Sequence, residues 1–220
     1  MKITNLILIN LIILVSITFA NDFKKWAHET SDLKPDPSIT FGTLSNGIRY
    51  AIMPNAEPPK RISMRLYVDA GSLMENEQQQ GLSHFIEHMA FNGTKNFPAG
   101  EMVEYFQRLG MSFGGDTNAH TSFKETVYKL ELPKPELDMV DQGMLLFRDY
   151  ADGMLMSQEE IEKERGVILS ELITRDSAEW RTQKEAYKFA LPDSLISKRF
   201  PIGKKEVIKG AGRPEFMNYY

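Results

Sequence analysis

The sequence contains no cysteine in its 220 residues. Disulfide bonds, zinc sites built from cysteine and catalysis by a thiol are therefore excluded. Any metal ion bound by this chain must be held by His, Asp, Glu or water. The lack of cysteine is also compatible with an oxidising compartment, because no thiol could mispair there.

An excess of charge of one sign, internal repeats and low-complexity segments are missing as well. The 26 Lys and Arg and 30 Asp and Glu are mixed along the chain and give a net charge of −4. This balance does not indicate a nucleic-acid or anionic-membrane surface. With 42% hydrophobic residues, the chain can bury a core as one large domain or two small ones.

Long apolar runs are absent except at the N-terminus. Residues 1–20 begin with a positive charge at Lys2, continue with an apolar run and end with the small residue Ala20. This pattern is typical of a secretory signal peptide. The alternative is a membrane anchor formed by residues 3–20, but the run is short for a membrane span and carries polar residues. We expect cleavage before Asn21, a periplasmic or secreted protein, and no stable membrane association afterwards.

Alternation of apolar and polar residues predicts the strands. Residues 39–53 alternate on both sides of Asn46-Gly47, a strong two-residue turn signal, and predict a β-hairpin. The same alternation predicts strands over residues 62–68 and 122–132.

Apolar residues at helical spacing predict helices in five places. They cover residues 81–91, 101–109, 135–152, 157–180 and 183–190. In the third of these we expect the core face to consist of Leu137, Val140, Met144, Phe147 and Ala151. Residues 191–209 are expected to form a loop, and another helix begins near Phe216. The fold class is therefore α+β, a mainly antiparallel sheet with helices packed on one face.

The most informative stretch is the predicted helix that contains His84, Glu87 and His88. At about 100° per residue these three side chains lie on one face of the helix, opposite an apolar stripe. Two imidazoles one turn apart can bind one metal ion, and a nearby carboxylate can accept a proton from water at that ion. The pattern is H-x-x-E-H, the inverted form of the zinc-protease motif. The alternative is a solvated helix face that happens to carry these residues.

A catalytic zinc ion usually takes three protein ligands, so a third is needed. The helix expected from residue 157 carries Glu164 and Glu171, seven residues apart on one face. Either could supply a carboxylate. They could also be two exposed glutamates on a Glu-rich helix, and spacing alone does not choose between these possibilities.

Four blocks of sequence occur in the order typical of one group of peptidases. The blocks are residues 84–95, 115–122, 125–128 and 164–171. They resemble the pitrilysin, insulysin and mitochondrial-processing-peptidase family of zinc metallopeptidases. The similarity extends from about Phe41 to Ile208, and it resembles in particular the long bacterial periplasmic members, which begin with a signal peptide and a comparable Gly-Thr-Leu-x-Asn-Gly hairpin.

This resemblance implies specific roles for the site residues. His84, His88 and Glu171 would be the ligands of one Zn²⁺ ion, and Glu87 would be the catalytic general base. Glu164 would be an acidic residue that supports the ligands without binding the ion itself. The resemblance, not the spacing, selects Glu171 over Glu164, and the distance from His88 to Glu171 is somewhat longer than in pitrilysin, which suggests a small insertion.

The resemblance also implies a substrate-binding strand. Asn118 and Ala119 would lie on an edge strand that pairs with the substrate backbone. The alternative for Asn118 is ordinary turn chemistry. His120 stands where an aromatic residue is common in the family; it could contact the substrate or place a nitrogen near the metal, but a plain edge-strand residue is the expectation.

Members of the family pair such a domain with a similar C-terminal one that closes over the substrate. After a leader arm over residues 21–38, we therefore expect residues 39–220 to be the N-terminal zinc peptidase domain of a longer protein. Its partners would be a peptide or unfolded protein substrate, and C-terminal domains of the same chain or a partner subunit. The fragment alone is expected to cleave weakly or not at all.

The function implied is that of a zinc-dependent endopeptidase acting on peptides or unfolded polypeptides. One alternative is a non-catalytic peptide-binding or assembly subunit of the same fold, although such relatives usually lose residues from the motif. Another is a purely structural zinc site, which would not need Glu87 beside an open position.

Overall fold

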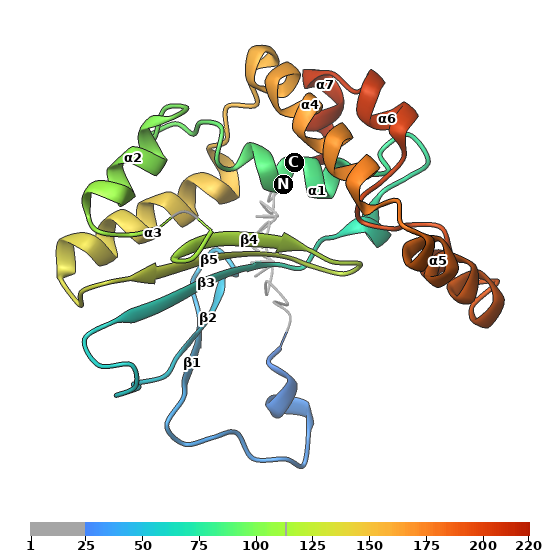
Figure 1. Ribbon diagram of the computed structural model, residues 1–220. Coiled ribbons are helices and arrows are strands. Elements are labelled where there is room, and N and C mark those ends of the chain that lie inside the picture. Colours follow the sequence, from blue (N-terminus) through green and yellow to red (C-terminus); the bar gives the residue numbers. More distant parts are fainter. Residues whose placement is uncertain (1–24, 113) are drawn as a thin grey trace, which may run out of the picture. The chain divides into compact units, whose positions relative to one another are not determined.

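The computed structural model describes residues 25–112 and 114–220, which fall into two units, one ending at Glu57 and one running from Pro58 to Tyr220 (Figure 1). The predicted signal peptide and the first residues of the leader arm lie outside these ranges. No helix within the described ranges is long and apolar enough to cross a membrane.

The first unit contains the predicted β-hairpin, formed by β1 (Thr40–Thr43) and β2 (Arg49–Ile52) in antiparallel pairing. Its turn covers three residues, 45–47, rather than the two expected. The amide of Gly47 donates to the carbonyl of Leu44, and the amide of Leu44 donates to the carbonyl of Ile48. Gly47 has a positive φ of 90°, so the Asn-Gly signal was correct although the turn type was not.

The segment before the hairpin is a short 3₁₀ helix, η1 (Ala27–Thr30), preceded by Trp26. The rings of Trp26 and Phe41 meet edge to face at 4.9 Å. The guanidinium of Arg49 lies 4.7 Å from the centre of the Trp26 ring, a cation–π contact. The leader arm is therefore attached to the hairpin through its aromatic residues.

The second unit is built on a three-stranded antiparallel sheet in the order β3-β5-β4. The strands are β3 (Ile62–Val68), β4 (Thr117–Thr121) and β5 (Thr126–Leu132). Residues 122–125 were expected in the last strand but form the turn between β4 and β5, closed by a hydrogen bond from the Ser122 amide to the Glu125 carbonyl. Along β3 half-buried and exposed residues alternate as expected, so one face of the sheet is covered.

Helices cover that face of the sheet (Figure 1). In chain order the helices of this unit are α1 (Leu82–Met89), α2 (Glu101–Arg108), α3 (Leu137–Asp152), α4 (Gln158–Arg175), α5 (Ala178–Ala190), α6 (Lys205–Gly210) and α7 (Arg213–Tyr219), with short 3₁₀ helices η2 (Ser72–Met74) and η3 (Leu195–Ser197). Of these, α1 and α3 pack against the strands of the sheet, and α5 lies beside it. The predicted α+β class with helices on an antiparallel sheet is confirmed.

The end of α4 differs from the prediction. The helix was expected to reach Trp180, but it ends at Arg175, because Ser177 caps the next helix by accepting a hydrogen bond from the Trp180 amide. The predicted loop over residues 191–209 is also wrong in part, since it contains η3 and most of α6.

The buried face of α3 is only partly the one expected, since Phe147 is buried as predicted. Leu137 and Met144 are 74% and 56% exposed, whereas the buried residues of α3 include Met139, Gly143, Leu146, Phe147 and Tyr150. A Cβ atom at Gly143 would lie 3.0 Å from side-chain atoms of Leu130 and Met64. The helix therefore turns its glycine toward the sheet, because the missing side chain allows the two backbones to approach closely.

The helix α1 is buried nearly all round. Its apolar stripe of Leu82, Phe85, Ile86 and Met89 lies in the core as predicted, each at most 7% exposed. Phe85 meets Phe216 of α7 edge to face at 4.7 Å.

The N-terminal end of α1 is fixed by buried polar groups. The carboxylate of Glu75 accepts hydrogen bonds from the amides of Gly81 (3.0 Å) and Ser83 (2.9 Å), a favourable place for a negative charge. Burial raises the pKa of Glu75 in spite of these bonds. Arg199 donates to the Glu75 carbonyl at 3.0 Å, which attaches the segment after η3 to the same point.

Gly203 packs its backbone against Gly81 at the start of α1. Its φ is +77°, and a Cβ atom there would overlap the Gly81 backbone. We expect Gly203→Ala to lower the free energy of unfolding by about 2–4 kcal/mol, through backbone strain and overpacking together. Gly110→Ala is the matched control, because Gly110 has a similar φ of +85° and open space around it. Denaturant unfolding of both variants measures the difference; equal losses would show that the contact with Gly81 is unimportant.

Candidate metal centre

Side chains from α1 and α4 converge at one point. His84 and His88 project from α1 toward Glu171 of α4, and the Nε2 atoms of the two imidazoles lie 3.5 Å and 3.6 Å from Oε2 of Glu171. One donor atom from each of the three residues lies within 4.8 Å of the others. Two imidazoles and one carboxylate are a donor set that catalytic zinc sites use. The arrangement therefore fits a divalent cation such as zinc.

The polar face of α1 is not a solvated surface. His84 and Glu87 are only 6% and 8% exposed, since the side chains of α4 and β4 cover this face in place of water. Burying two imidazoles and a carboxylate is unfavourable unless they are paired or ligated. The face is therefore not the solvated one of the alternative interpretation at His84 and Glu87.

His84 is held in the neutral form. Burial, together with the nearby His88 and Arg175, lowers its pKa from 6.5 to about 3. A neutral imidazole can bind a metal ion without first losing a proton. Among the described residues its Nδ1 atom has no hydrogen-bond partner, so packing orients this ring.

His88 is oriented by a hydrogen bond. Its Nδ1 atom lies 2.8 Å from Oε1 of Glu164, and Asn92 donates to the other carboxylate oxygen of Glu164 at 2.9 Å. Asn92 also donates to the His88 carbonyl at 3.2 Å. With Nδ1 bound to a carboxylate, Nε2 of His88 is left as the nitrogen that faces Glu171, an arrangement common in metal sites.

The pKa values of this pair move apart. Burial lowers the pKa of His88, but the hydrogen bond and charge of Glu164 outweigh it, so the pKa is raised above 6.5. Burial raises the pKa of Glu164, but the hydrogen bonds from His88 and Asn92 outweigh it, so the pKa is lowered below 4.5.

The geometry separates the two glutamates that spacing could not distinguish. Glu164 lies on the Nδ1 side of His88, whereas Glu171 lies on the Nε2 side of both imidazoles. Glu171 also forms an ion pair with Arg175, through its other oxygen, Oε1. Oε2 is therefore the atom that it presents to the imidazoles. Glu171 lines an open groove along α4 with Gly166, Val167, Ser170 and Thr174.

Glu87 lies beside His84, His88 and Glu171, and one of its carboxylate oxygens accepts a hydrogen bond. Thr121 of β4 donates to its Oε2 atom at 2.7 Å. Burial raises the pKa of Glu87, although the hydrogen bond from Thr121 opposes the effect.

Sequence reasoning did not single out Thr121 or Asn92. The alternation of β4 could have indicated Thr121, because it shares a face with Ala119 and Thr117.

The predicted substrate strand is confirmed as an edge. β4 pairs only with β5 among the described strands. The side chain of Asn118 donates to the Gly114 carbonyl at 3.0 Å and accepts from the Ala119 amide at 2.8 Å. Asn118 is therefore engaged in local turn chemistry, and binding of a peptide at Asn118 and Ala119 stays a prediction.

His120 does not face the metal centre. By the alternation of β4 it points away from Thr121, and it is exposed, with Nε2 3.8 Å from Glu125. The idea that it adds a nitrogen near the metal is wrong, and the expectation of a plain edge-strand residue agrees with its position.

Comparison with known proteins identifies relatives of this chain. The model of the insulinase family (peptidase family M16) matches residues 50–193. The probable zinc protease PqqL of Escherichia coli is 35% identical over 188 residues, which cover 86% of this chain and 20% of PqqL. The crystal structure of the first half of this periplasmic protease superposes with a TM-score of 0.82, covering 86% of this chain and 40% of that one. Pitrilysin is 25% identical with a TM-score of 0.66, covering 82% of this chain and 19% of that one. The chain thus spans about a fifth of the length of PqqL.

One relative is a subunit of a larger complex. Subunit 1 of the bovine mitochondrial cytochrome b-c1 complex is 30% identical over 160 residues, which cover 72% of this chain and 31% of that subunit.

The paired pKa shifts predict how the metal-free protein depends on pH. The raised pKa of His88 contributes stability in full below pH 6.5, and this is lost as the pH rises through the raised value. The lowered pKa of Glu164 contributes above pH 4.5, and this is lost as the pH falls through the lowered value. Both contributions are present together between pH 4.5 and 6.5.

Glu164→Gln should therefore lower the pKa of His88 and destabilise the metal-free protein most between those pH values. An NMR titration of the imidazole and thermal unfolding at several pH values measure the two effects. Glu162→Gln is the control, since Glu162 lies on the same helix, is exposed and pairs with Arg165 instead of His88. An unchanged His88 pKa in Glu164→Gln would contradict the assignment of the pair.

Proposed function

The chain belongs to the insulinase family of peptidases, family M16, and from that premise we propose that it forms the zinc-binding part of an endopeptidase. Its substrates would be peptides or unfolded polypeptides. The observation that carries the proposal is the convergence of His84, His88 and Glu171 from two helices, with the buried carboxylate of Glu87 beside them.

We propose His84, His88 and Glu171 as the ligands of one Zn²⁺ ion. The donor set supports this, since the neutral His84 and the oriented His88 both present Nε2 to the Glu171 carboxylate. When bound, zinc supplies Lewis-acid chemistry at this point, polarising a peptide carbonyl and making a water molecule more acidic. Glu164 keeps His88 in the tautomer that leaves Nε2 available.

Glu87 would act as the general base. Burial raises its pKa, so its carboxylate accepts a proton from water more readily than an exposed one would. Thr121 holds Oε2, which leaves Oε1 for the proton transfer. The same group can then pass the proton to the amine that leaves when the peptide bond breaks.

The edge strand β4 would bind the substrate by strand addition. Its outer edge can pair with an extended peptide, with Asn118 and Ala119 as the contact residues. The Thr121 hydrogen bond places the end of this strand at Glu87. A peptide running along β4 would therefore be carried toward the general base.

We further propose that other domains of a longer chain, or a partner subunit, complete the site. The fraction of PqqL that this chain matches supports this. A single domain would leave a bound substrate exposed to water. A second domain that closed over the substrate would hold the peptide bond in the orientation that catalysis needs.

We propose a periplasmic location. The signal-like pattern of residues 1–20 and the similarity to a periplasmic protease both support it.

The second candidate is a non-catalytic subunit of the same fold. The similarity to a subunit of the cytochrome b-c1 complex keeps this candidate open. The presence of the general base, the two imidazoles and the third ligand together favours the peptidase. Of these two candidates, only the peptidase is expected to bind one zinc ion per chain.

Glu87→Gln tests the peptidase proposal directly. In the complete protein we expect zinc content to be unchanged and the cleavage rate to fall by about 10²–10⁴, because the proton acceptor is lost. Metal analysis and peptide hydrolysis measure the two quantities. Glu101→Gln, at an exposed position at the start of α2, is the control and should cleave normally. Equal cleavage by wild type and Glu87→Gln would refute the role.

The location has its own test. Expression with export and N-terminal sequencing of the mature protein should give a chain that begins at Asn21. A mature protein that keeps Met1 and sediments with membranes would instead support the anchor.

A further inference from the structure

Two segments that flank the metal helices in sequence are paired with each other. Thr94, five residues after α1, forms an antiparallel bridge with Met154, four residues before α4. The Lys95 amide donates to the Gly153 carbonyl at 2.8 Å, and the Leu155 amide donates to the Gly93 carbonyl at 3.1 Å. The end of α1 is thus joined to the start of α4.

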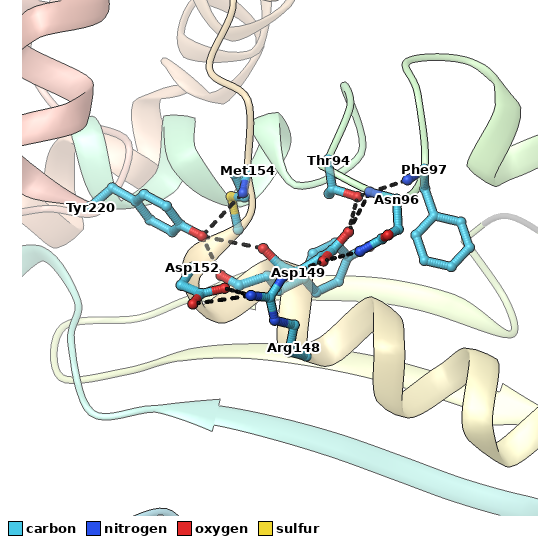
Figure 2. Close-up of polar contacts among 9 residues, drawn as sticks. Thr94, Asn96, Phe97, Arg148, Asp149, Asp152, Met154 and Tyr220 are labelled. Carbon is cyan, nitrogen blue, oxygen red and sulfur yellow. Dashed lines mark hydrogen bonds and ion pairs between the residues drawn. The ribbon is translucent and has the colours of Figure 1, made fainter. Parts of the chain in front are cut away.

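Asp149, near the end of α3, fastens this pairing (Figure 2). Its side chain is fully buried. Oδ2 accepts from the Thr94 hydroxyl at 2.7 Å and the Asn96 amide at 2.8 Å. Oδ1 accepts from the Asn96 side chain at 2.8 Å and from Arg148 at 3.2 Å. Four donors converge on a side chain that can only accept, so a carboxylate is the group the position requires.

Tyr220 contacts the same pairing of residues 93–95 with residues 153–155, called the junction below. Its hydroxyl accepts from the Met154 amide at 3.2 Å and lies 3.2 Å and 3.1 Å from the carbonyls of Asp149 and Tyr150. Figure 2 shows this hydroxyl and the Asp149 carboxylate on opposite sides of the end of α3. The segment between α3 and α4 is therefore held from two directions.

The junction lies between the two groups that form the metal centre. His84 and His88 are on the helix that ends just before it, and Glu164 and Glu171 are on the helix that begins just after it. A shift of either helix along the other would therefore strain the bridge and the hydrogen bonds to Asp149. Resting on the proposed function, we propose that Asp149 is a positioning residue for the metal centre, which sets the separation between the imidazoles of α1 and the carboxylate of Glu171.

The competing explanation is a polar network that stabilises the fold and nothing more. Both explanations predict a lower melting temperature when Asp149 is changed. Only a positioning role predicts that the folded protein also binds zinc less tightly, because its ligands are then held at the wrong distance. The deciding measurement is zinc affinity at a temperature where every variant is folded.

The test compares Asp149→Asn with Asp152→Asn in the complete protein, made metal-free and titrated with zinc against a chelator. In Asp149→Asn an amide donor would face the donors of Asn96 and Arg148. We expect zinc affinity to fall by about 10–100-fold, the range seen when groups behind metal ligands are changed. Asp152 is on the same helix and also pairs with Arg148, but it is 65% exposed. Its variant should bind zinc within about twofold of wild type, because an exposed pair contributes little.

A double variant tests whether the hydrogen bonds themselves are responsible. In Asn96→Asp with Asp149→Asn, the new amide at position 149 can donate to the new carboxylate at position 96. Its oxygen can still accept from Thr94 and the backbone. We expect most of the zinc affinity to return. The absorption spectrum of the cobalt-substituted protein, which reports ligand geometry, should change in Asp149→Asn and return toward wild type in the double variant.

The outcomes separate the two proposals. Wild-type protein that binds no zinc would overturn the proposed function and the positioning role together. Wild-type protein that binds zinc, with equal affinity in a less stable Asp149→Asn, would overturn the positioning role alone. If Asp149→Asn does not fold, Thr94→Val removes one of the four donors at nearly constant volume and should weaken zinc binding several-fold; unchanged affinity there would also overturn the role.

Discussion

The structure depends on the burial of the polar face of α1 against α4. Removing two imidazoles and a carboxylate from water is unfavourable, and it is offset only if each finds a partner. His88 finds Glu164, and Glu87 finds Thr121. The Nε2 atom of His84 lies 3.5 Å from the carboxylate of Glu171, and its Nδ1 atom has no hydrogen-bond partner among the described residues, so a cation at this point would complete what the protein side chains leave incomplete. The same burial moves the pKa values of His84 and Glu87 in the directions that metal binding and proton acceptance require.

Because the centre is shared between two helices, its geometry depends on what holds them. Glu75 and Arg199 fix the beginning of α1, and Phe216 packs against its middle. Beyond its end, the chain is bridged to the approach to α4, with Asp149 inside the bridge. Apart from the hydrogen bond between Glu75 and Gly81, these contacts join residues more than fifty positions apart. The region after α5 therefore contributes to holding α1, the helix that carries His84 and His88.

Most elements of the fold could be predicted, because alternation and helical spacing depend on neighbouring residues. The error on α3 occurred where distant contacts decided the outcome, whereas the errors at the end of α4 and in the first hairpin turn were local. On α3 the apolar residues occupy more than one side, and the sheet selects the side with Gly143, which a count of hydrophobic residues overlooks. At the end of α4, Ser177 competes for the helix by capping the next one. The turn of the first hairpin includes one residue more than the Asn-Gly signal indicates.

For the site, the spacing of His84, Glu87 and His88 determined that these side chains share one face of a helix, since helical geometry is local. Spacing could not determine which glutamate of α4 faces the Nε2 atoms. The number of residues between two helices does not say how the helices are placed against each other. Only the tertiary structure placed Glu171 toward both imidazoles and Glu164 behind His88. It also brought Thr121 and Asn92 to the centre and turned His120 away, since each of these depends on how a strand and two helices pack together.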